Sequence, residues 1–180
     1  DLTIEASEIK GVGEIRIKTL PCRVESIDKI HDVAVLRLKL PVAERLQFMA
    51  GQYIDILMKD GKARSFSIAN APHDDAFIEL HIRHQVGGSF SEYVFNQMKV
   101  REIMRFKGPL GSFFLRENSD KPLILLASGT GFAPIKGIVE HALHQGGKRP
   151  MVLYWGARTR ADLYMSALPE QWQADYPALF

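Results

Sequence analysis

The sequence predicts two domains of different fold class: a small antiparallel β-barrel, then a parallel α/β domain that we expect to continue past residue 180. Between residues 20 and 113, six short segments with alternating or apolar residues are separated by glycine or proline turns, which is typical of a small barrel. After Asp120 the pattern changes to a continuous apolar segment, Leu123–Ala127, as expected for a parallel strand buried on both faces. A Gly-Thr-Gly turn and an amphipathic helix follow, which indicates a strand–helix–strand unit.

Composition places the chain among ordinary globular proteins. It has 180 residues, of which 46% are hydrophobic and 24% charged, and its net charge of +2 is too small to indicate nucleic-acid binding or a charged membrane partner. The single cysteine, Cys22, excludes an internal disulfide and fits a reducing compartment. No apolar run approaches the roughly 18 residues of a membrane span, and no signal peptide is visible, so we expect a cytoplasmic protein.

Alternation and turn residues bound the elements of the first domain. Pro41 ends the second strand, and Asp60-Gly61 forms the turn between the third and fourth. Gly87-Gly88 precedes a short helix from about Ser89 to Met98. The alternating segment Phe77–Arg83 should point its isoleucine and leucine side chains inward. The expected strands are Cys22–Ile27, Ala34–Leu40, Tyr53–Met58, Arg64–Ser67, Phe77–Arg83 and Glu102–Lys107.

The second domain should begin with a crossover between two parallel strands. Pro134 is suited to the first position of a helix, and the apolar positions after it have helical spacing. Gly146-Gly147 ends this helix, and Met151–Trp155 forms the second strand. Because a parallel sheet needs more than two strands, we expect several more beyond the chain. The expected organisation is a linker over 1–19, a barrel over 20–118 and the first part of an α/β domain over 119–180.

The stretch from Arg64 to Ser67 combines a cation, an aromatic ring and two hydroxyls. In a strand, Arg64 and Phe66 share one face, and Ser65 and Ser67 share the other. A planar ring system that carries a phosphate needs an aromatic surface, a guanidinium and a hydroxyl, and this stretch offers all three. The alternative is an amphipathic strand with Phe66 in the core and Arg64 in solvent.

The turn Gly129-Thr130-Gly131 lies between a buried strand and an amphipathic helix. Backbone N–H groups at a helix N-terminus attract anions, so a dinucleotide pyrophosphate fits there. The pattern departs from the usual dinucleotide fingerprint, because Pro134 takes the place of a third glycine. The second strand also ends in Gly156-Ala157-Arg158 rather than in an acidic residue that would bind a ribose. The alternative is a tight turn without a ligand.

A second glycine turn, Gly87–Ser91, precedes the short helix of the first domain. Its glycines let the backbone approach a ligand, and the helix start offers N–H donors for a phosphate. The alternative is a helix cap with no further role.

Taken together, these motifs resemble the ferredoxin–NADP reductase superfamily. The resemblance rests on Arg64-Ser65-Phe66-Ser67, on Gly87-Gly88-x-x-Ser91, and on Gly129–Pro134 followed by Tyr154–Arg158. It covers residues 20–180 and is strongest toward flavin reductases, dioxygenase-type electron-transfer reductases and the CDP-6-deoxy-glucoseen reductase group. It implies an FAD-binding barrel and a domain that binds NAD(P)H as substrate.

The resemblance also implies roles for individual residues. Arg64 would bind the flavin pyrophosphate, Phe66 would cover the isoalloxazine ring, and Ser67 would hydrogen-bond flavin N5, while Thr130 would lie beside the nicotinamide. Ser67 and Thr130 are therefore the expected catalytic residues, and Asn70 stands where Ser or Thr is common. The expected cofactor-binding residues are Arg64, Ser65, Phe66, Ser67, His81, Ile82, Arg83, Gly87, Gly88, Ser89, Phe90, Ser91, Gly129, Thr130, Gly131, Phe132, Ala133, Pro134, Gly156 and Arg158.

Residues 1–19 look like the linker that follows a plant-type ferredoxin domain in multidomain reductases. A 2Fe–2S cluster would then lie upstream, because it needs four cysteines and this chain has one. The leading hypothesis is an NAD(P)H-dependent flavoenzyme that passes electrons to an iron–sulfur centre or partner protein. The alternatives are a flavin reductase that releases reduced flavin, and a non-catalytic electron-relay subunit. The sequence does not choose between NADH and NADPH.

Histidine pairs give no metal site in this interpretation. His81 and His84 are three apart on an expected strand and face opposite ways. His141 and His144 could share a helix face, and a solvated face is expected there rather than a metal site without a carboxylate or cysteine ligand.

Overall fold

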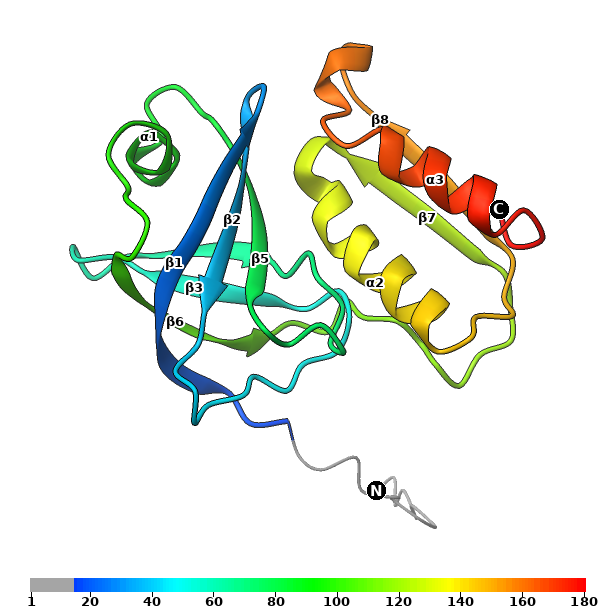
Figure 1. The fold of residues 1–180 in the computed structure, drawn as a ribbon, viewed down its shortest axis with the longest axis horizontal. Coiled ribbons are helices and arrows are strands. Elements are labelled where there is room, and N and C mark those ends of the chain that lie inside the picture. Colours follow the sequence, from blue (N-terminus) through cyan, green and yellow to red (C-terminus); the bar gives the residue numbers. More distant parts are fainter. Residues whose placement is uncertain (1–14) are drawn as a thin grey trace, which may run out of the picture.

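The computed structural model describes residues 15–180, so most of the expected linker lies outside the described residues. Two units lie side by side (Figure 1): a domain of six strands, and a smaller unit of two strands with helices. Among the described residues, no helix is both long and apolar enough to cross a bilayer.

The first unit is one antiparallel sheet in the order β4-β3-β6-β1-β2-β5, which confirms the predicted six-stranded antiparallel domain. Its edges approach each other just after β4, where Ile68 bridges Leu80 of β5 and the Ala69 N–H donates to the Glu79 carbonyl oxygen at 2.8 Å. The strands are β1 (Lys18–Ile30), β2 (Val33–Lys39), β3 (Tyr53–Leu57), β4 (Ala63–Ser67), β5 (Ile78–Arg83) and β6 (Ile103–Leu110).

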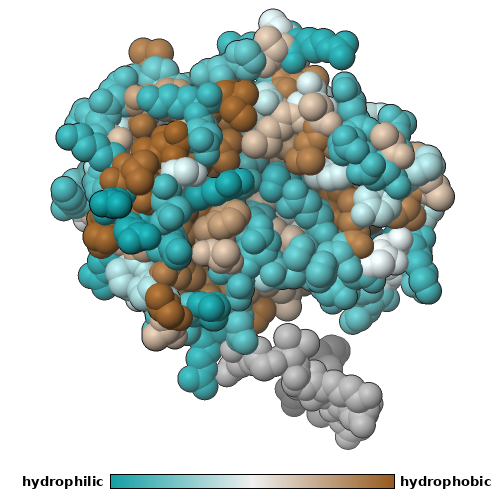
Figure 2. All heavy atoms as spheres, viewed as in Figure 1, coloured by the Kyte–Doolittle hydropathy of each residue, from teal (hydrophilic) through white to brown (hydrophobic). Residues whose placement is uncertain are grey.

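Apolar side chains on the inner face of this sheet form the barrel core. Ile54, Ile56, Leu80 and Phe106 are each 0% exposed. Helix α1 (Ser89–Asn96) adds Phe90 and Val94 to the same cluster. In Figure 2, hydrophobic side chains show through the surface in the region where Figure 1 places α1, among hydrophilic ones.

Strand β1 is much longer than the sequence predicts. We expected Cys22–Ile27, but the strand begins at Lys18, inside the expected linker, and ends at Ile30. The extra length arises because its two ends pair with different neighbours. Residues Lys18–Arg23 face β6, and residues from Arg23 onward face β2, with an irregularity between Val24 and Ser26.

Strand β5 is buried on both faces, whereas its alternation predicts that only Ile78, Leu80 and Ile82 point inward. Glu79 and His81, on the opposite face, are only 2% and 4% exposed. They are covered by the second unit, since Lys136 and Tyr164 contact them directly. Polar residues on this strand therefore mark a junction between the two units rather than a solvated face.

The second unit contains the predicted parallel crossover. Strands β7 (Leu123–Ser128) and β8 (Met151–Gly156) pair in parallel through α2 (Phe132–His144), which packs on β7. The 3-10 turn η1 (Gly129–Gly131) precedes α2, so Pro134 is its third residue rather than the predicted first. The turn η2 (Arg160–Asp162) and helix α3 (Ala167–Asp175) complete the unit.

One face of this two-stranded sheet is bare in the described chain, so the expectation of a strand buried on both faces is wrong here. Leu125 and Ala127 of β7 lie under α2 and are 5% and 6% exposed. Ile124 and Leu126, on the other face, are each 77% exposed. Helix α3 lies on the covered side as well, since its Trp172 ring is 6.0 Å from that of Phe132.

Candidate functional site

Strand β4 presents Arg64 and Phe66 on its inward face, as its alternation predicts. These residues pair with Ile56 and Ile54, both fully buried, and directly opposed residues of an antiparallel pair share a face. The outward Ser65 hydroxyl donates to Asp55 Oδ1 at 2.6 Å. Arg64 is exposed, and its guanidinium donates only to the neighbouring Ala63 carbonyl, at 2.9 Å, among the described residues. Its charge is therefore available to a ligand.

Phe66 and Phe90 bring β4 and the start of α1 together, with ring centroids 5.3 Å apart. The first N–H groups of a helix have no partner within it, so α1 directs donors from Ser89 and Phe90 toward its N-terminal end. Gly88 precedes them, and a Cβ there would lie 2.8 Å from Ser91 Oγ and 3.0 Å from the Gln85 carbonyl oxygen. The turn is thus closed to any side chain at position 88.

Ser91 has a different environment from the one expected of a phosphate ligand. It is 7% exposed, and its hydroxyl lies 3.0 Å from both the N–H and the carbonyl oxygen of Gln85. The Gly88 carbonyl oxygen is also 3.0 Å from it. These contacts use the hydroxyl to shape the turn, and the Gly88 N–H also donates within it, to the Gln85 carbonyl oxygen at 2.8 Å. The amides of Ser89 and Phe90 at the start of α1, not the Ser91 side chain, are therefore the donors left for a phosphate.

The end of β5 connects the barrel to the Gly129–Gly131 turn. Arg83 Nε lies 3.4 Å from Asp32 Oδ2, and its Nη2 lies 3.4 Å from the Asp162 carbonyl oxygen. The guanidinium carbon would be 3.6 Å from a Cβ on Gly129. Arg83 thus spans the two units beside the dinucleotide-type turn.

Two neighbours of Arg83 on β5 do not offer side chains to a cofactor. Ile82 is 1% exposed and belongs to the barrel core. The His81 side chain is 0% exposed, with Nδ1 2.6 Å from the Tyr164 hydroxyl and Nε2 3.1 Å from Glu79 Oε1. The family resemblance placed both residues at the flavin site, but a resemblance in sequence does not show that Ile82 packs in the barrel core or that the second unit covers His81.

The turn before α2 is partly open to solvent. A Cβ on Gly131 would meet nothing within 4 Å, and Thr130 is half-buried. Gly129 has a φ of +51°, and its carbonyl oxygen accepts a hydrogen bond of 2.9 Å from Trp155 Nε1. Residue pairing of Ser128 with Gly156 puts the exposed Gly156–Arg158 segment beside the turn, at the carboxyl edge of the sheet. Nucleotides bind at this edge in open α/β sheets.

Phe132 and Ala133 were expected to contact the dinucleotide, but both side chains are buried, at 0% and 3% exposure. The Phe132 ring stacks on Trp155, with centroids 3.9 Å apart and an angle of 9°. These two side chains pack the start of the helix onto the sheet. Their position at the helix start did not reveal this, because it does not show which way the first residues of the helix face.

Asn70 closes the loop after β4 through its side chain. It is 1% exposed, donates to the carbonyl oxygens of Asp74 at 2.7 Å and Phe77 at 2.9 Å, and accepts from the Glu79 N–H at 2.8 Å. One side chain thus satisfies two backbone carbonyl oxygens and one backbone N–H of this segment.

A buried polar cluster lies between the units and consists of Glu79, His81, Lys136 and Tyr164; of these, only His81 was among the predicted site residues. Burial raises the pKa of Glu79, but the His81 hydrogen bond and the Lys136 charge outweigh this and lower it to about 2. Burial lowers the pKa of His81, so its ring is neutral at pH 7. No sequence pattern signalled these contacts, because Glu79 and Lys136 come from different domains.

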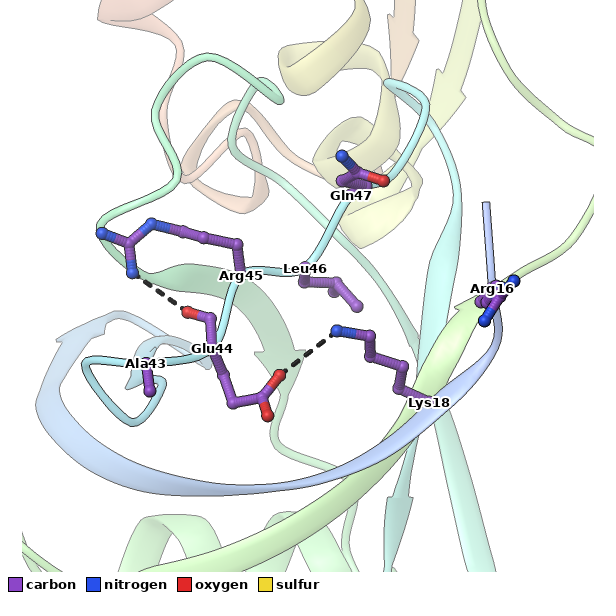
Figure 3. A pocket seen from close by; sticks show the side chains of 7 residues that line it. All are labelled: Arg16, Lys18, Ala43, Glu44, Arg45, Leu46 and Gln47. Carbon is purple, nitrogen blue, oxygen red and sulfur yellow. Dashed lines mark hydrogen bonds and ion pairs between the residues drawn. The ribbon is translucent and has the colours of Figure 1, made fainter. Parts of the chain in front are cut away.

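Two cavities are lined by none of the expected cofactor-binding residues, although the second has Glu79 and Lys136 in its lining. One, of about 490 Å³, lies between the start of β1 and residues 43–47 (Figure 3), where Lys18 Nζ is 3.2 Å from Glu44 Oε2; none of the expected site residues lines it. A groove of about 840 Å³ runs between the barrel, α2 and α3. Within residues 15–180, no group of three or more His, Cys, Asp or Glu side chains is arranged to hold a metal ion.

Comparison with known proteins supports the two-domain interpretation. Residues 21–115 match the oxidoreductase FAD-binding domain family, and residues 125–180 match the oxidoreductase NAD-binding domain family. The CDP-6-deoxy-L-threo-D-glycero-4-hexulose-3-dehydrase reductase of Yersinia pestis is 40% identical over 98% of this chain and 53% of its own length. Terephthalate 1,2-dioxygenase reductase component 1 of Comamonas sp. is 42% identical with the same coverage of both chains.

Solved structures agree. The crystal structure of the Amycolatopsis cytochrome P450 reductase GcoB superposes with a TM-score of 0.83 at 33% identity, over 89% of this chain and 50% of that one. Ferredoxin–NADP+ reductase from Plasmodium falciparum, at 18% identity and a TM-score of 0.77, shares the fold over 89% of this chain and 67% of its own. The chain spans about half the length of the curated relatives named above. It belongs to the ferredoxin–NADP reductase superfamily of FAD- and NAD-binding oxidoreductases.

Proposed function

We propose that the protein takes a hydride from NAD(P)H onto bound FAD and passes the electrons to an iron–sulfur centre or partner protein. The observation that carries this proposal is the convergence of three segments around the end of β5. Phe66 of β4 meets Phe90 at the start of α1, and Arg83 reaches from β5 to the Gly129 turn. A flavin-side strand and a nucleotide-side turn are thereby brought to the same junction.

The residues present fit an FAD pyrophosphate. Arg64 offers an exposed guanidinium, and the start of α1, directly after Gly88, presents the backbone amides of Ser89 and Phe90. In this proposal Phe66 lies against the isoalloxazine ring and Ser67 holds flavin N5. Among the described residues the Ser67 side chain has no hydrogen-bond partner, which leaves its hydroxyl available. Thr130 and Gly131 lie beside the nicotinamide nucleotide.

Bound FAD would supply the redox chemistry, because a flavin accepts two electrons as a hydride and can release them one at a time. The chain's own residues then bind and orient the two ring systems and need not exchange a proton. The iron–sulfur acceptor must come from elsewhere, since the single Cys22 is 2% exposed in the barrel core and a 2Fe–2S cluster needs four ligands. Relatives described as reductase components of dioxygenase systems support such an acceptor.

The test uses the full-length protein under anaerobic conditions. We expect a bound flavin spectrum that is bleached by NADH or NADPH, and the nucleotide that bleaches it identifies the donor. Arg64→Ala should weaken FAD binding on the order of tenfold or more, because it removes a charged hydrogen-bond donor. Arg23→Ala is the matched control: Arg23 is also a strand residue, and its guanidinium pairs with Glu25 at 2.9 Å on the surface.

Three outcomes would count against the proposal. A colourless protein that reduces only added flavin would identify a flavin reductase that releases its product. Bound flavin that neither nucleotide bleaches would point to an electron-relay subunit. Equal FAD affinity in the Arg64 and Arg23 variants would mean that Arg64 does not bind the pyrophosphate.

A further inference from the structure

The buried carboxylate of Glu79 joins the two units through one partner. Glu79 is 2% exposed. Two of its contacts come from the barrel: Arg37 Nε lies 3.1 Å from Oε2, and His81 Nε2 lies 3.1 Å from Oε1. The third comes from the other unit, where Lys136 Nζ of α2 lies 3.1 Å from Oε1. An ion pair this well covered is screened far less than a surface pair.

Lys136 contacts the barrel backbone as well. Its Nζ is 3.4 Å from the Ala69 carbonyl oxygen, and the side chain is 12% exposed. The next residue, Gly137, lets the helix backbone approach: a Cβ there would be 3.0 Å from the Asn70 carbonyl oxygen. Lys136 and Gly137 therefore fix one turn of α2 against the segment that follows β4.

Both ends of this contact are close in sequence to proposed ring-binding residues. Ala69 is two residues after Ser67, and Lys136 is about one helical turn beyond the Gly129–Gly131 turn. A helical turn is a rigid spacer with a rise of about 1.5 Å per residue, so a shift at Lys136 moves the start of α2 with it. The contact thus joins the flavin side of the junction to its nicotinamide side.

We propose that the Lys136–Glu79 ion pair is a positioning contact that holds the nicotinamide-binding turn at the correct distance from the flavin-binding strand. The inference rests on the proposed function. Bound FAD would accept, as a hydride, the electron pair that the reduced nicotinamide gives up. Lys136 and Glu79 exchange no proton or electron; they keep the two rings in near contact, on which transfer rates depend steeply.

The contact is tested with the full-length holoprotein and three single variants. Lys136→Met keeps the length of the side chain and removes its charge, whereas Lys136→Arg keeps the charge. Glu140→Gln is the matched control, because Glu140 Oε2 contacts Lys136 Nζ at 3.0 Å from the same helix, and within residues 15–180 Glu140 makes no hydrogen bond or ion pair with the barrel.

We expect Lys136→Met to slow flavin bleaching at saturating nucleotide on the order of ten- to hundredfold. Its Kd for the oxidised nucleotide and its FAD content should stay within about twofold of wild type, since no proposed ligand-binding residue is changed. The charge-transfer absorbance between flavin and bound nicotinamide should weaken. Lys136→Arg should restore most of the rate and of this absorbance, and Glu140→Gln should behave like wild type.

A second measurement is independent of turnover. Amide hydrogen exchange of residues 68–71 should accelerate in Lys136→Met and not in Glu140→Gln, because this segment loses its contact with the Lys136 ammonium. Unchanged exchange would overturn the inference, as would bleaching in Lys136→Met as fast as in Glu140→Gln. If Lys136→Met lost bound FAD, affinity for the nucleotide and bleaching rate together, the inference would also be overturned, because the residue would then have only a structural role. If neither nucleotide bleaches the wild-type protein, the proposed function fails, and the exchange data still decide whether the contact clamps the two units.

Discussion

The barrel and the β7–β8 unit bury their strands in different ways. In the barrel, six strands curve so that Ile56 and Leu80 meet in a closed core, and each is fully buried. In the second unit, Leu125 and Leu126 are neighbours in β7, yet they are 5% and 77% exposed. The two barrel strands alternate apolar and polar residues, whereas Leu123–Ala127 is apolar throughout. The comparison shows that an apolar run identifies a strand, whereas the number of covered faces depends on which other elements are present.

The junction between the two units differs from both cores because it mixes apolar and charged contacts. Val33 and Ala50 of the barrel belong to the apolar cluster of the second unit, while Glu79 and Lys136 pair beside it. Apolar contacts are non-directional, whereas a buried charge must lie beside a specific partner of opposite charge. This division of roles is why the proposed positioning contact lies among charged residues.

The largest effect that the comparison predicts is in the closed core. Phe106→Ala should destabilise the protein by about 3–5 kcal/mol, because it leaves a cavity in a fully enclosed site. Urea unfolding measures this, with Phe113→Ala as the control, since Phe113 is 60% exposed and its loss should cost less than about 0.5 kcal/mol. Similar midpoints for the two variants would show that the barrel is not the more tightly packed region.

The two faces of β7 give the next test. Leu125→Ala should cost about 2–5 kcal/mol in the 180-residue chain, whereas Leu126→Ala should cost less than about 0.5 kcal/mol. In a longer chain that adds strands and helices over this face, the second value should rise toward the first. A small effect of Leu126→Ala in both chains would mean that nothing covers this face.

The smallest predicted effect concerns pH at the junction. Burial holds the pKa of His81 below its usual value, so the unfolded chain binds more protons than the folded one below about pH 6.5. Stability should therefore fall as the pH drops from 6.5 to 5.5, by up to about 1 kcal/mol. Glu79 adds no slope in this window, because its pKa is about 2 and its contribution disappears only between roughly pH 4.5 and 2.

Urea unfolding at pH 7.5, 6.5 and 5.5 measures this dependence, and His81→Gln should have a shallower slope than wild type. The slope should not vanish, because burial and the neighbouring His144 and His141 also lower the pKa of His73. An identical slope in both proteins would mean that His81 does not titrate on unfolding.

Most of the fold could be predicted from local patterns. Turn residues such as Asp60-Gly61 and the strand–turn–helix order around Gly129 depend only on neighbouring residues, and the structure contains both elements. The first and last residues of each strand were harder to predict from the sequence. Strand β1 shows why, since its ends are set by pairing with β6 and β2. The site residues divide in the same way: Arg64 and Gly131 are accessible as expected, whereas His81, Ile82, Ser91 and Phe132 are buried.

By itself the sequence determined the order of strands and helices, the two glycine turns and the alternation that separates Arg64 and Phe66 from Ser65, because each depends on residues close together in the chain. The tertiary structure alone decided which of these side chains remain open to a ligand and which contacts join the two units. Lys136 and the Ala69 carbonyl are 67 residues apart, and no local pattern encodes their meeting. Burial and charge pairing are properties of segments brought together by folding, so they appear only when the barrel and α2 are packed against each other.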